Sequence, residues 1–347
     1  MLQDVVSRYL PRINREIEKY LDDIIRKQSD ELVKRYYSVM KDYILSGGKR
    51  WRPISFIMAY KGVGGREEEE AIKTSISIEF LHNSSLAQDD IMDKSLIRRG
   101  KPALHVRYAD EIGSGNQVLG EALGILGGDS LLELGLEVIV SSNFQIEAKI
   151  DAVSMYLYFY RRLIEGQTLD MSYPTISLMS EEQIVNMMRL KTSSLFICSL
   201  LMGARLGGCK SNVLDVLRKY GENVGIAFQI RDDILGVFGD PEITGKSVID
   251  DLREGKKTLL LYKTLQLAQP SEKRFIKSKI GSDDISIEDI KKIRRIMVET
   301  GALNYVEAKA ETYVREGIKV LDTVPELTTE FVEFLKELAF KSVKRKL

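Results

Sequence analysis

The sequence predicts an all-α fold, and three observations support this. Nearly every segment of the 347-residue chain places apolar side chains at helical spacing. Convincing runs that alternate apolar and polar residues, as strands do, are missing. The 7 prolines are scattered and no Gly/Ser-rich linker divides the chain, so we expect one domain over residues 1–347. With 44% apolar residues, this domain can bury a large core, which favours one large helical bundle.

Composition excludes several classes of function. Lys plus Arg and Asp plus Glu number 51 each, so no net field attracts the chain to nucleic acid or anionic lipid. Cys198 and Cys209 belong to no metal or redox pattern and are expected to be buried thiols in a reducing compartment. No signal peptide is evident, and the apolar stretch 195–206 contains Arg205 and is too short to span a bilayer. We therefore expect a cytoplasmic protein without a membrane span.

The first 53 residues predict a helical cover followed by an anion-binding turn. Residues 1–46 carry apolar side chains at amphipathic spacing, which indicates one or two helices. Residues 47–53 read Gly-Gly-Lys-Arg-Trp-Arg-Pro. The glycines break the helix and allow close approach of a ligand, and Pro53 suits the first turn of the next helix. Three cations at a helix N-terminus favour an anion site, although such a turn taken alone is more often a solvated loop.

The next segment combines carboxylates with cations. Residues 71–86 predict a mostly apolar helix, with Asp89, Asp90 and Asp93 at its C-terminal end. Asp89 and Asp93 share a face, and like charges at ~4 Å repel by on the order of 4 kcal/mol at an effective dielectric of about 20. Oxygen ligands of this kind favour Mg²⁺. Three cations that suit phosphate oxygens follow: Arg98, Arg99 and Lys101. Taken alone, the cluster is equally compatible with a solvated helix end and a basic loop.

A second acid pair repeats this pattern and favours the functional interpretation. The apolar run 225–230 is followed by Asp232 and Asp233, which could not be buried unpaired without large pKa shifts. We expect two helices that end in acid groups and face each other across a cleft. Such a pair would hold several Mg²⁺ ions around one diphosphate.

The two motifs resemble the aspartate-rich motifs of the trans-isoprenyl diphosphate synthases, the family that includes farnesyl and geranylgeranyl diphosphate synthases. The first motif matches Asp-Asp-x-x-Asp in full, whereas the second has Gly236 where many members have a third Asp. The resemblance implies an isoprenoid-synthase bundle around a deep central cavity. It also implies that Mg²⁺ is held by five residues: Asp89, Asp90, Asp93, Asp232 and Asp233.

The resemblance extends over residues 46–258 and implies where two substrates bind. The diphosphate of isopentenyl diphosphate is assigned to Gly48, Lys49, Arg52, His82 and Arg99, with Arg50 as support. The allylic diphosphate is assigned to Arg98, Lys191, Lys246 and Lys256. Further residues are implied near the metals or the developing carbocation: Gln167, Asp170, Thr192 and Gln229. Ala103 departs from the family's Thr and removes one hydroxyl.

The implied reaction is ionisation, condensation and elimination, which yields a linear trans-prenyl diphosphate. Shorter-chain members commonly place an aromatic residue four or five positions before the first aspartate, where this chain has Ser85 and Ser84. Phe80 and Leu81, about a turn deeper, are expected to form the floor. This favours geranylgeranyl diphosphate, with a longer polyprenyl or a farnesyl product as the alternative. A terpene cyclase and a non-catalytic subunit of a heteromeric synthase are the other hypotheses, and a homodimer is the family's usual state.

Overall fold

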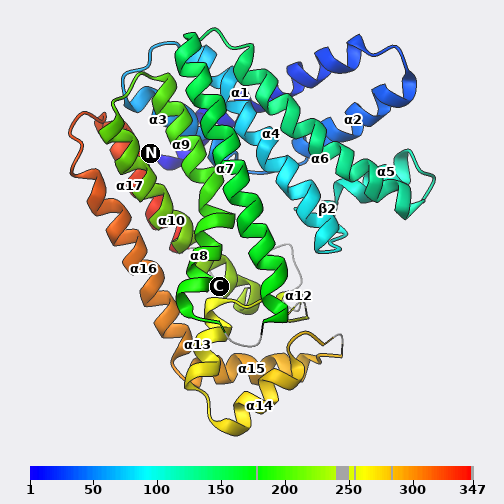
Figure 1. Ribbon diagram of the computed structural model, residues 1–347, viewed down its shortest axis with the longest axis vertical. Helices are drawn as coiled ribbons and strands as arrows, with labels where there is room; N and C mark the ends of the chain where they lie inside the picture. The colour runs from blue at the N-terminus through cyan, green and yellow to red at the C-terminus, as the bar shows by residue number, and fades with distance from the viewer. Residues whose placement is uncertain (177–178, 240–249, 254, 283, 345–347) are drawn as a thin grey trace. The chain divides into compact units, whose positions relative to one another are not determined.

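The computed structural model describes residues 1–176, 179–239, 250–253, 255–282 and 284–344, and the all-α prediction is confirmed (Figure 1). Within the described residues, sheet is limited to β1 (Ile97–Arg98) and β2 (Lys101–Pro102), which pair antiparallel. The described chain forms two compact units, each assembled from separate stretches of sequence. The first comprises Met1–Leu157, Cys198–Leu214 and Glu326–Phe334, and the second comprises Tyr158–Ile197, Asp215–Pro325 and Leu335–Leu347. The prediction of one domain over residues 1–347 stays a prediction.

The first unit is built around a long apolar helix. It contains α1 (Leu2–Lys27), α2 (Glu31–Leu45), α3 (Trp51–Gly62), α4 (Glu68–Met92), α5 (Leu104–Glu111) and α6 (Gln117–Val140). Parts of α7 (Ile146–Ser172), α9 (Ser194–Leu206), α10 (Ser211–Phe238) and α17 (Thr329–Val343) complete it. Helix α4 packs against α1, α3, α5 and α6, and Figure 1 shows α4 and α6 side by side.

Local sequence explains why the first two helices form where they do. Helix α1 buries Tyr9, Ile13, Ile17 and Leu21 at four-residue spacing, so one face lies in the core. Helix α2 starts where the Asp30 carboxylate accepts hydrogen bonds from the N–H groups of its first turn. Residues 1–46 therefore form two helices, one of the two alternatives that the sequence left open.

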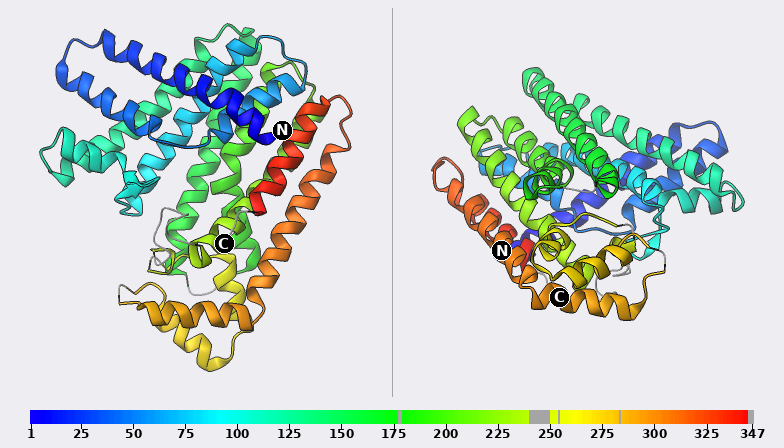
Figure 2. Two further views of the ribbon diagram at one scale, coloured as in Figure 1. Left: turned by 180° about the vertical axis from the view of Figure 1, so that it is seen from behind. Right: turned by 60° about the horizontal axis from the view of Figure 1, so that its bottom comes forward.

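The second unit contains the remaining described helices. These are the end of α7, η1 (Tyr173–Thr175), α8 (Glu181–Met188), η2 (Arg189–Ser193), the start of α9, most of α10, α12 (Asp250–Arg253), α13 (Leu259–Leu267), α14 (Pro270–Lys279), α15 (Ile287–Glu299), α16 (Ala302–Leu321) and the end of α17. Figure 2 shows a sharp bend between α15 and α16, both drawn in orange. Gly301 lies at this junction as the N-cap of α16 and has φ +76°. Glycine suits this left-handed conformation because it has no Cβ. One apolar core runs through α8, α10, α13, α15 and α16.

Candidate active site

The first acid motif lies at the C-terminal end of α4, as predicted. Asp89 and Asp90 are in the last turn, and Asp93 caps the helix with its N–H donating to the Asp89 carbonyl at 2.8 Å. Asp90 is fully buried, whereas Asp89 and Asp93 are half-buried. Arg98 Nε donates to Asp90 Oδ1 at 2.8 Å, and Arg98 Nη2 lies 3.5 Å from Asp89 Oδ2. Burial raises the pKa of Asp90, and the contact with Arg98 offsets only part of this effect.

The donor set of this motif suits a hard divalent cation. Asp90 Oδ2 is buried and accepts no hydrogen bond from the part of the chain that the structure describes. Over the same residues, no group of three or more His, Cys, Asp or Glu side chains is arranged so that it could hold a metal ion. Mg²⁺ does not need such a group, because it usually takes one or two carboxylates and completes its shell with water and phosphate oxygens. The oxygen-only chemistry of the motif therefore fits Mg²⁺.

The glycine turn of residues 47–53 carries a cluster of cations. Gly48 has φ +107°, and Lys49 is exposed, as an anion-binding turn requires. Arg52 is half-buried, with Nη1 3.2 Å from His82 Nε2. Arg99 Nη1 donates to the Gly47 carbonyl at 2.9 Å. The structure therefore brings residues of the turn together with His82 and Arg99.

His82 is a neutral side chain in this cluster. Burial, followed by the fields of Arg52 and Arg99, lowers the pKa of His82 well below its ordinary value of 6.5. A guanidinium can only donate, so we assign His82 Nε2 as the acceptor and the ring proton to Nδ1. This tautomer leaves Nδ1 as a donor.

The second unit brings its own predicted residues together. Lys191 Nζ lies 2.6 Å from Asp170 Oδ2. Thr192 Oγ1 donates to Gln229 Oε1, and Gln229 Nε2 donates to Asp233 Oδ1 at 2.7 Å. Gln167 is also buried. The lysine and the threonine lie in η2, a π-helical turn of the kind often found at functional sites.

Two glycines allow neighbouring helices to approach this π turn closely. A Cβ atom at Gly166 in α7 would lie 2.3 Å from the Lys191 backbone nitrogen. A Cβ atom at Gly225 in α10 would lie 2.4 Å from Ser193 Oγ. Such distances are incompatible with any side chain, so these glycines are required for the packing of η2.

One structural detail of the second acid motif was predicted wrongly. Asp232 and Asp233 do not end their helix, because α10 continues to Phe238. Ile234 and Val237 are buried in the apolar core, and their packing extends the helix beyond the acid pair. Asp233 is almost completely buried, and Asp232 is half-buried.

The remaining predicted residues have varied environments. The predicted chain-length residues are mostly buried: Phe80, Leu81 and Ser84 fully, and Ser85 by about half. The Phe80 ring packs against the Tyr20 ring of α1, with 5.6 Å between the ring centroids. Lys256 is half-buried in the segment before α13. Lys246 lies outside the described residues.

Glu79 was not predicted as a site residue, and its carboxylate pairs with Arg50 at 2.6 Å in the interior of the first unit. The signal was a lone acidic residue inside the apolar run 76–81. Asn83 was missed as well, and its Nδ2 donates to Glu79 Oε1 at 3.0 Å. Both residues lie on α4, three positions before and one position after His82, and Glu79 links them to Arg50 of the glycine turn.

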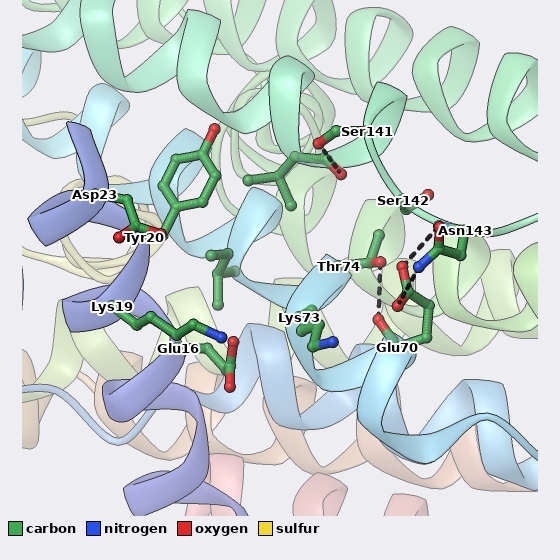
Figure 3. A pocket seen from close by; sticks show the side chains of 12 residues that line it. Glu16, Lys19, Tyr20, Asp23, Glu70, Lys73, Thr74, Ser141, Ser142 and Asn143 are labelled. Atoms are coloured by element: carbon green, nitrogen blue, oxygen red, sulfur yellow. Dashed lines mark hydrogen bonds between the residues drawn. The ribbon is translucent and has the colours of Figure 1, made fainter. Parts of the chain in front are cut away.

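A hollow of about 260 Å³ lies elsewhere in the first unit, between α1, the start of α4 and the end of α6 (Figure 3). Its lining includes Lys19, Glu70, Lys73, Thr74 and Asn143. Thr74 precedes Asp89 by 15 residues, which is about 22 Å along a helix. None of the predicted site residues lines this hollow, so it is separate from the candidate active site.

Comparison with known proteins identifies the family. Residues 33–297 match the family model described as polyprenyl synthetase. The chain belongs to the polyprenyl synthetase family. It is a trans-prenyltransferase, as the sequence motifs predicted. Since the match covers most of the chain, the family assignment does not depend on the two acid motifs alone.

Three relatives illustrate the range of this similarity. The chain is 31% identical to the geranylgeranyl diphosphate synthase of Saccharolobus solfataricus over the full length of both chains. It is 36% identical to the geranylfarnesyl diphosphate synthase of Aeropyrum pernix, over 95% of this chain and 99% of the relative. A similar solved structure is the crystal structure of geranylgeranyl pyrophosphate synthase from Corynebacterium glutamicum, complexed with isoprenyl diphosphate and magnesium. It matches with a TM-score of 0.91 and 30% sequence identity, over 98% of this chain and 99% of the other.

The longest apolar helical stretch is buried. Within the described residues, Glu181–Leu206 is the one stretch long and apolar enough to cross a membrane by length and composition. It is longer than the expected 195–206 because α8, η2 and α9 follow one another without a break. Of the 18-residue apolar window in this stretch, 72% is buried inside the protein, as in core helices that pass the same test of length and composition.

Proposed function

We propose that this enzyme condenses isopentenyl diphosphate with allylic diphosphates to a linear trans-prenyl diphosphate, geranylgeranyl diphosphate. One observation carries the proposal. Arg98 and Arg99 are neighbours in the chain, yet Arg98 contacts the acid motif and Arg99 contacts the glycine turn. Arg99 has φ +55°, which lets the two side chains diverge. An acid motif and a cation-rich turn joined in this way suit two diphosphate substrates, whereas a terpene cyclase needs no second diphosphate site.

In this proposal the chain's own residues hold both diphosphates. Lys49, Arg52, His82 and Arg99, with the Gly48 backbone, bind isopentenyl diphosphate through charge-assisted hydrogen bonds. The allylic diphosphate is bound by Arg98, Lys191, Lys246 and Lys256. Alignment of the two substrates lowers the barrier by several kcal/mol, and apolar surroundings exclude water from the cation.

Mg²⁺ completes this proposed site. Asp89, Asp93, Asp232 and Asp233 would hold the ions, together with Asp90 Oδ2, which remains available while Oδ1 accepts from Arg98. When bound, Mg²⁺ neutralises the diphosphate and makes it a better leaving group. The Thr192 hydroxyl and the Gln229 amide, linked to each other, would face the carbon from which the diphosphate leaves. The departed diphosphate takes the proton that the condensed product loses.

Product length follows from the small side chains near the acid motif. In this proposal Ser84 and Ser85 leave room for the growing chain that an aromatic residue would fill, and the buried Phe80, packed against Tyr20, forms the floor of the site. This supports a twenty-carbon product. We further propose a cytoplasmic location, and a homodimer, the latter because α6 exposes four apolar side chains: Val118, Ile125, Leu126 and Val140.

Incubation of the purified protein with Mg²⁺, farnesyl diphosphate and labelled isopentenyl diphosphate tests the proposal. We expect a linear twenty-carbon diphosphate, and no product when EDTA replaces Mg²⁺. A cyclic hydrocarbon would indicate a terpene cyclase, and absence of turnover would indicate a non-catalytic subunit. A longer linear chain would retain the reaction and contradict the product length.

A further inference from the structure

An ion pair between Arg50 and Glu79 is buried behind the glycine turn. The two side chains are 0% and 3% exposed, and Arg50 Nη1 donates to Glu79 Oε1 at 2.6 Å. Arg50 Nε donates to Asn14 Oδ1 at 2.9 Å, and Arg50 Nη2 donates to the Ile44 carbonyl at 2.6 Å. Asn83 Nδ2 donates to the same Glu79 oxygen at 3.0 Å. Helices α1, α2 and α4 therefore all supply partners to one residue of the turn.

The side chain of Arg50 points in a different direction from those of the other cations of the turn. It adopts φ +53° at the N-cap of α3, so its side chain points into the protein, whereas Lys49 is exposed and Arg52 is half-buried beside His82. A Cβ atom at Gly48 would lie 3.2 Å from Arg50 Nη1 and 3.2 Å from Arg99 Nη1. The Arg50 guanidinium thus packs directly beneath the turn.

Such a pair is weak evidence for a purely stabilising role. Removing two charges from water costs free energy that their attraction often fails to recover, and apolar replacements of similar volume are often neutral or stabilising. Glu79 is also the buried carboxylate nearest in sequence to His82, three residues before it on α4. Its charge acts on Arg99 as well as on Arg50.

We infer that Glu79 and Arg50 form a positioning pair that fixes the turn so that Lys49, Arg52 and His82 converge on one diphosphate. Neither residue touches the substrate, because both are buried and their hydrogen bonds run into the helices. Glu79 keeps the Arg50 side chain pointing into the protein. Arg50 in turn fixes the backbone conformation between Lys49 and Arg52, the two cations that bind the diphosphate. The inference rests on the proposed function, since it concerns the site of isopentenyl diphosphate.

Two variants separate positioning from stability. Glu79→Gln keeps the size of the side chain and removes its charge. The double variant Arg50→Met/Glu79→Leu removes both charges and leaves neither unpaired in the interior, so its folding should survive. Glu68→Gln is the matched control, because it removes another carboxylate of α4 that pairs with Lys61 and Arg12. For each variant we would measure the KM of both substrates and the midpoint of thermal unfolding. Pyrophosphate binding in the presence of EDTA is measured by calorimetry.

We expect both test variants to raise the KM for isopentenyl diphosphate and weaken pyrophosphate binding at least 10-fold. The KM for the allylic substrate should stay within 2-fold of wild type, and the control should leave all binding values unchanged. Wild-type binding in the double variant, or failure of both variants to fold, would overturn the inference. If the wild-type protein does not elongate prenyl chains, the proposed function fails, and the pyrophosphate titration still decides the role of the pair.

Discussion

Glu68 shows how a carboxylate among cations couples stability to pH. It accepts hydrogen bonds from Lys61 Nζ at 2.5 Å, Arg12 Nη1 at 2.6 Å and Tyr9 OH at 2.9 Å. Burial alone would raise its pKa, but these contacts outweigh burial and lower the pKa from 4.5 to about 2. Because the folded state favours the ionised form, this stabilisation is present above pH 4.5 and is lost as the pH falls towards 2.

We therefore expect Glu68→Gln to lower the free energy of unfolding by about 1–2 kcal/mol at pH 7, a value reduced from the pKa shift to allow for solvent screening. At pH 3 the loss should be smaller, and urea unfolding at the two pH values measures both. Glu67→Gln, at the exposed neighbouring position, should change stability by less than about 0.5 kcal/mol. An equal loss at both pH values would contradict the assignment.

Ser84 tests the proposed control of product length. Its side chain is fully buried on α4, and its hydroxyl has no hydrogen-bond partner among the described residues, so a ring added there loses no polar contact. We expect Ser84→Phe to block elongation and shift the product from twenty towards fifteen carbons, measured by chromatography of the dephosphorylated alcohols. Lys73→Phe adds the same ring at an exposed position of α4 and should leave the product unchanged. An unaltered spectrum in folded Ser84→Phe protein would locate the floor elsewhere.

At the level of the helices, the π turn η2 depends on Gly166. Its Cβ position lies 2.3 Å from a backbone atom of Lys191, which cannot move aside as a flexible side chain can. We expect Gly166→Ala to cost about 1–3 kcal/mol of stability and to reduce kcat at least 10-fold, since Lys191 and its contact with Asp170 must shift. Thr168→Ala, at an exposed position two residues further on α7, is the control and should behave as wild type. Normal turnover of Gly166→Ala would show that η2 tolerates displacement.

The helices also show which features a sequence can predict. The end of α4 was predictable because apolar spacing and the three aspartates lie within one stretch. The end of α10 was not, since it depends on the packing of Ile234 and Val237 against other helices. The π turn requires glycines on two helices far from it in sequence, and the Arg50–Glu79 pair joins residues 29 apart. Local patterns predict local structure, whereas contacts distant in sequence decide where elements end and which charges meet.

For the molecule as a whole, the family match spans residues 33–297 and so includes stretches of both compact units. The acid motif with the glycine turn belongs to the first unit, and Asp232, Asp233 and Lys191 belong to the second. The proposed reaction needs residues of both.

The exposed apolar face of α6 predicts how the molecule assembles. Helix α6 exposes Ile125 and Leu126 about halfway, at 49% and 54%, and Val118 and Val140 still further. Apolar side chains gathered on one helix favour burial against a second copy, and a stable dimer needs about 800 Å² per partner. We expect Ile125→Asp/Leu126→Asp to convert a dimer into a monomer at micromolar concentration in analytical ultracentrifugation, because each carboxylate would be desolvated in the interface. Leu32→Asp, at an exposed position of α2, is the control and should leave the dimer intact. A dimer that survives the double substitution must use another surface, and a monomeric wild-type protein would leave the exposed face of α6 for a different partner.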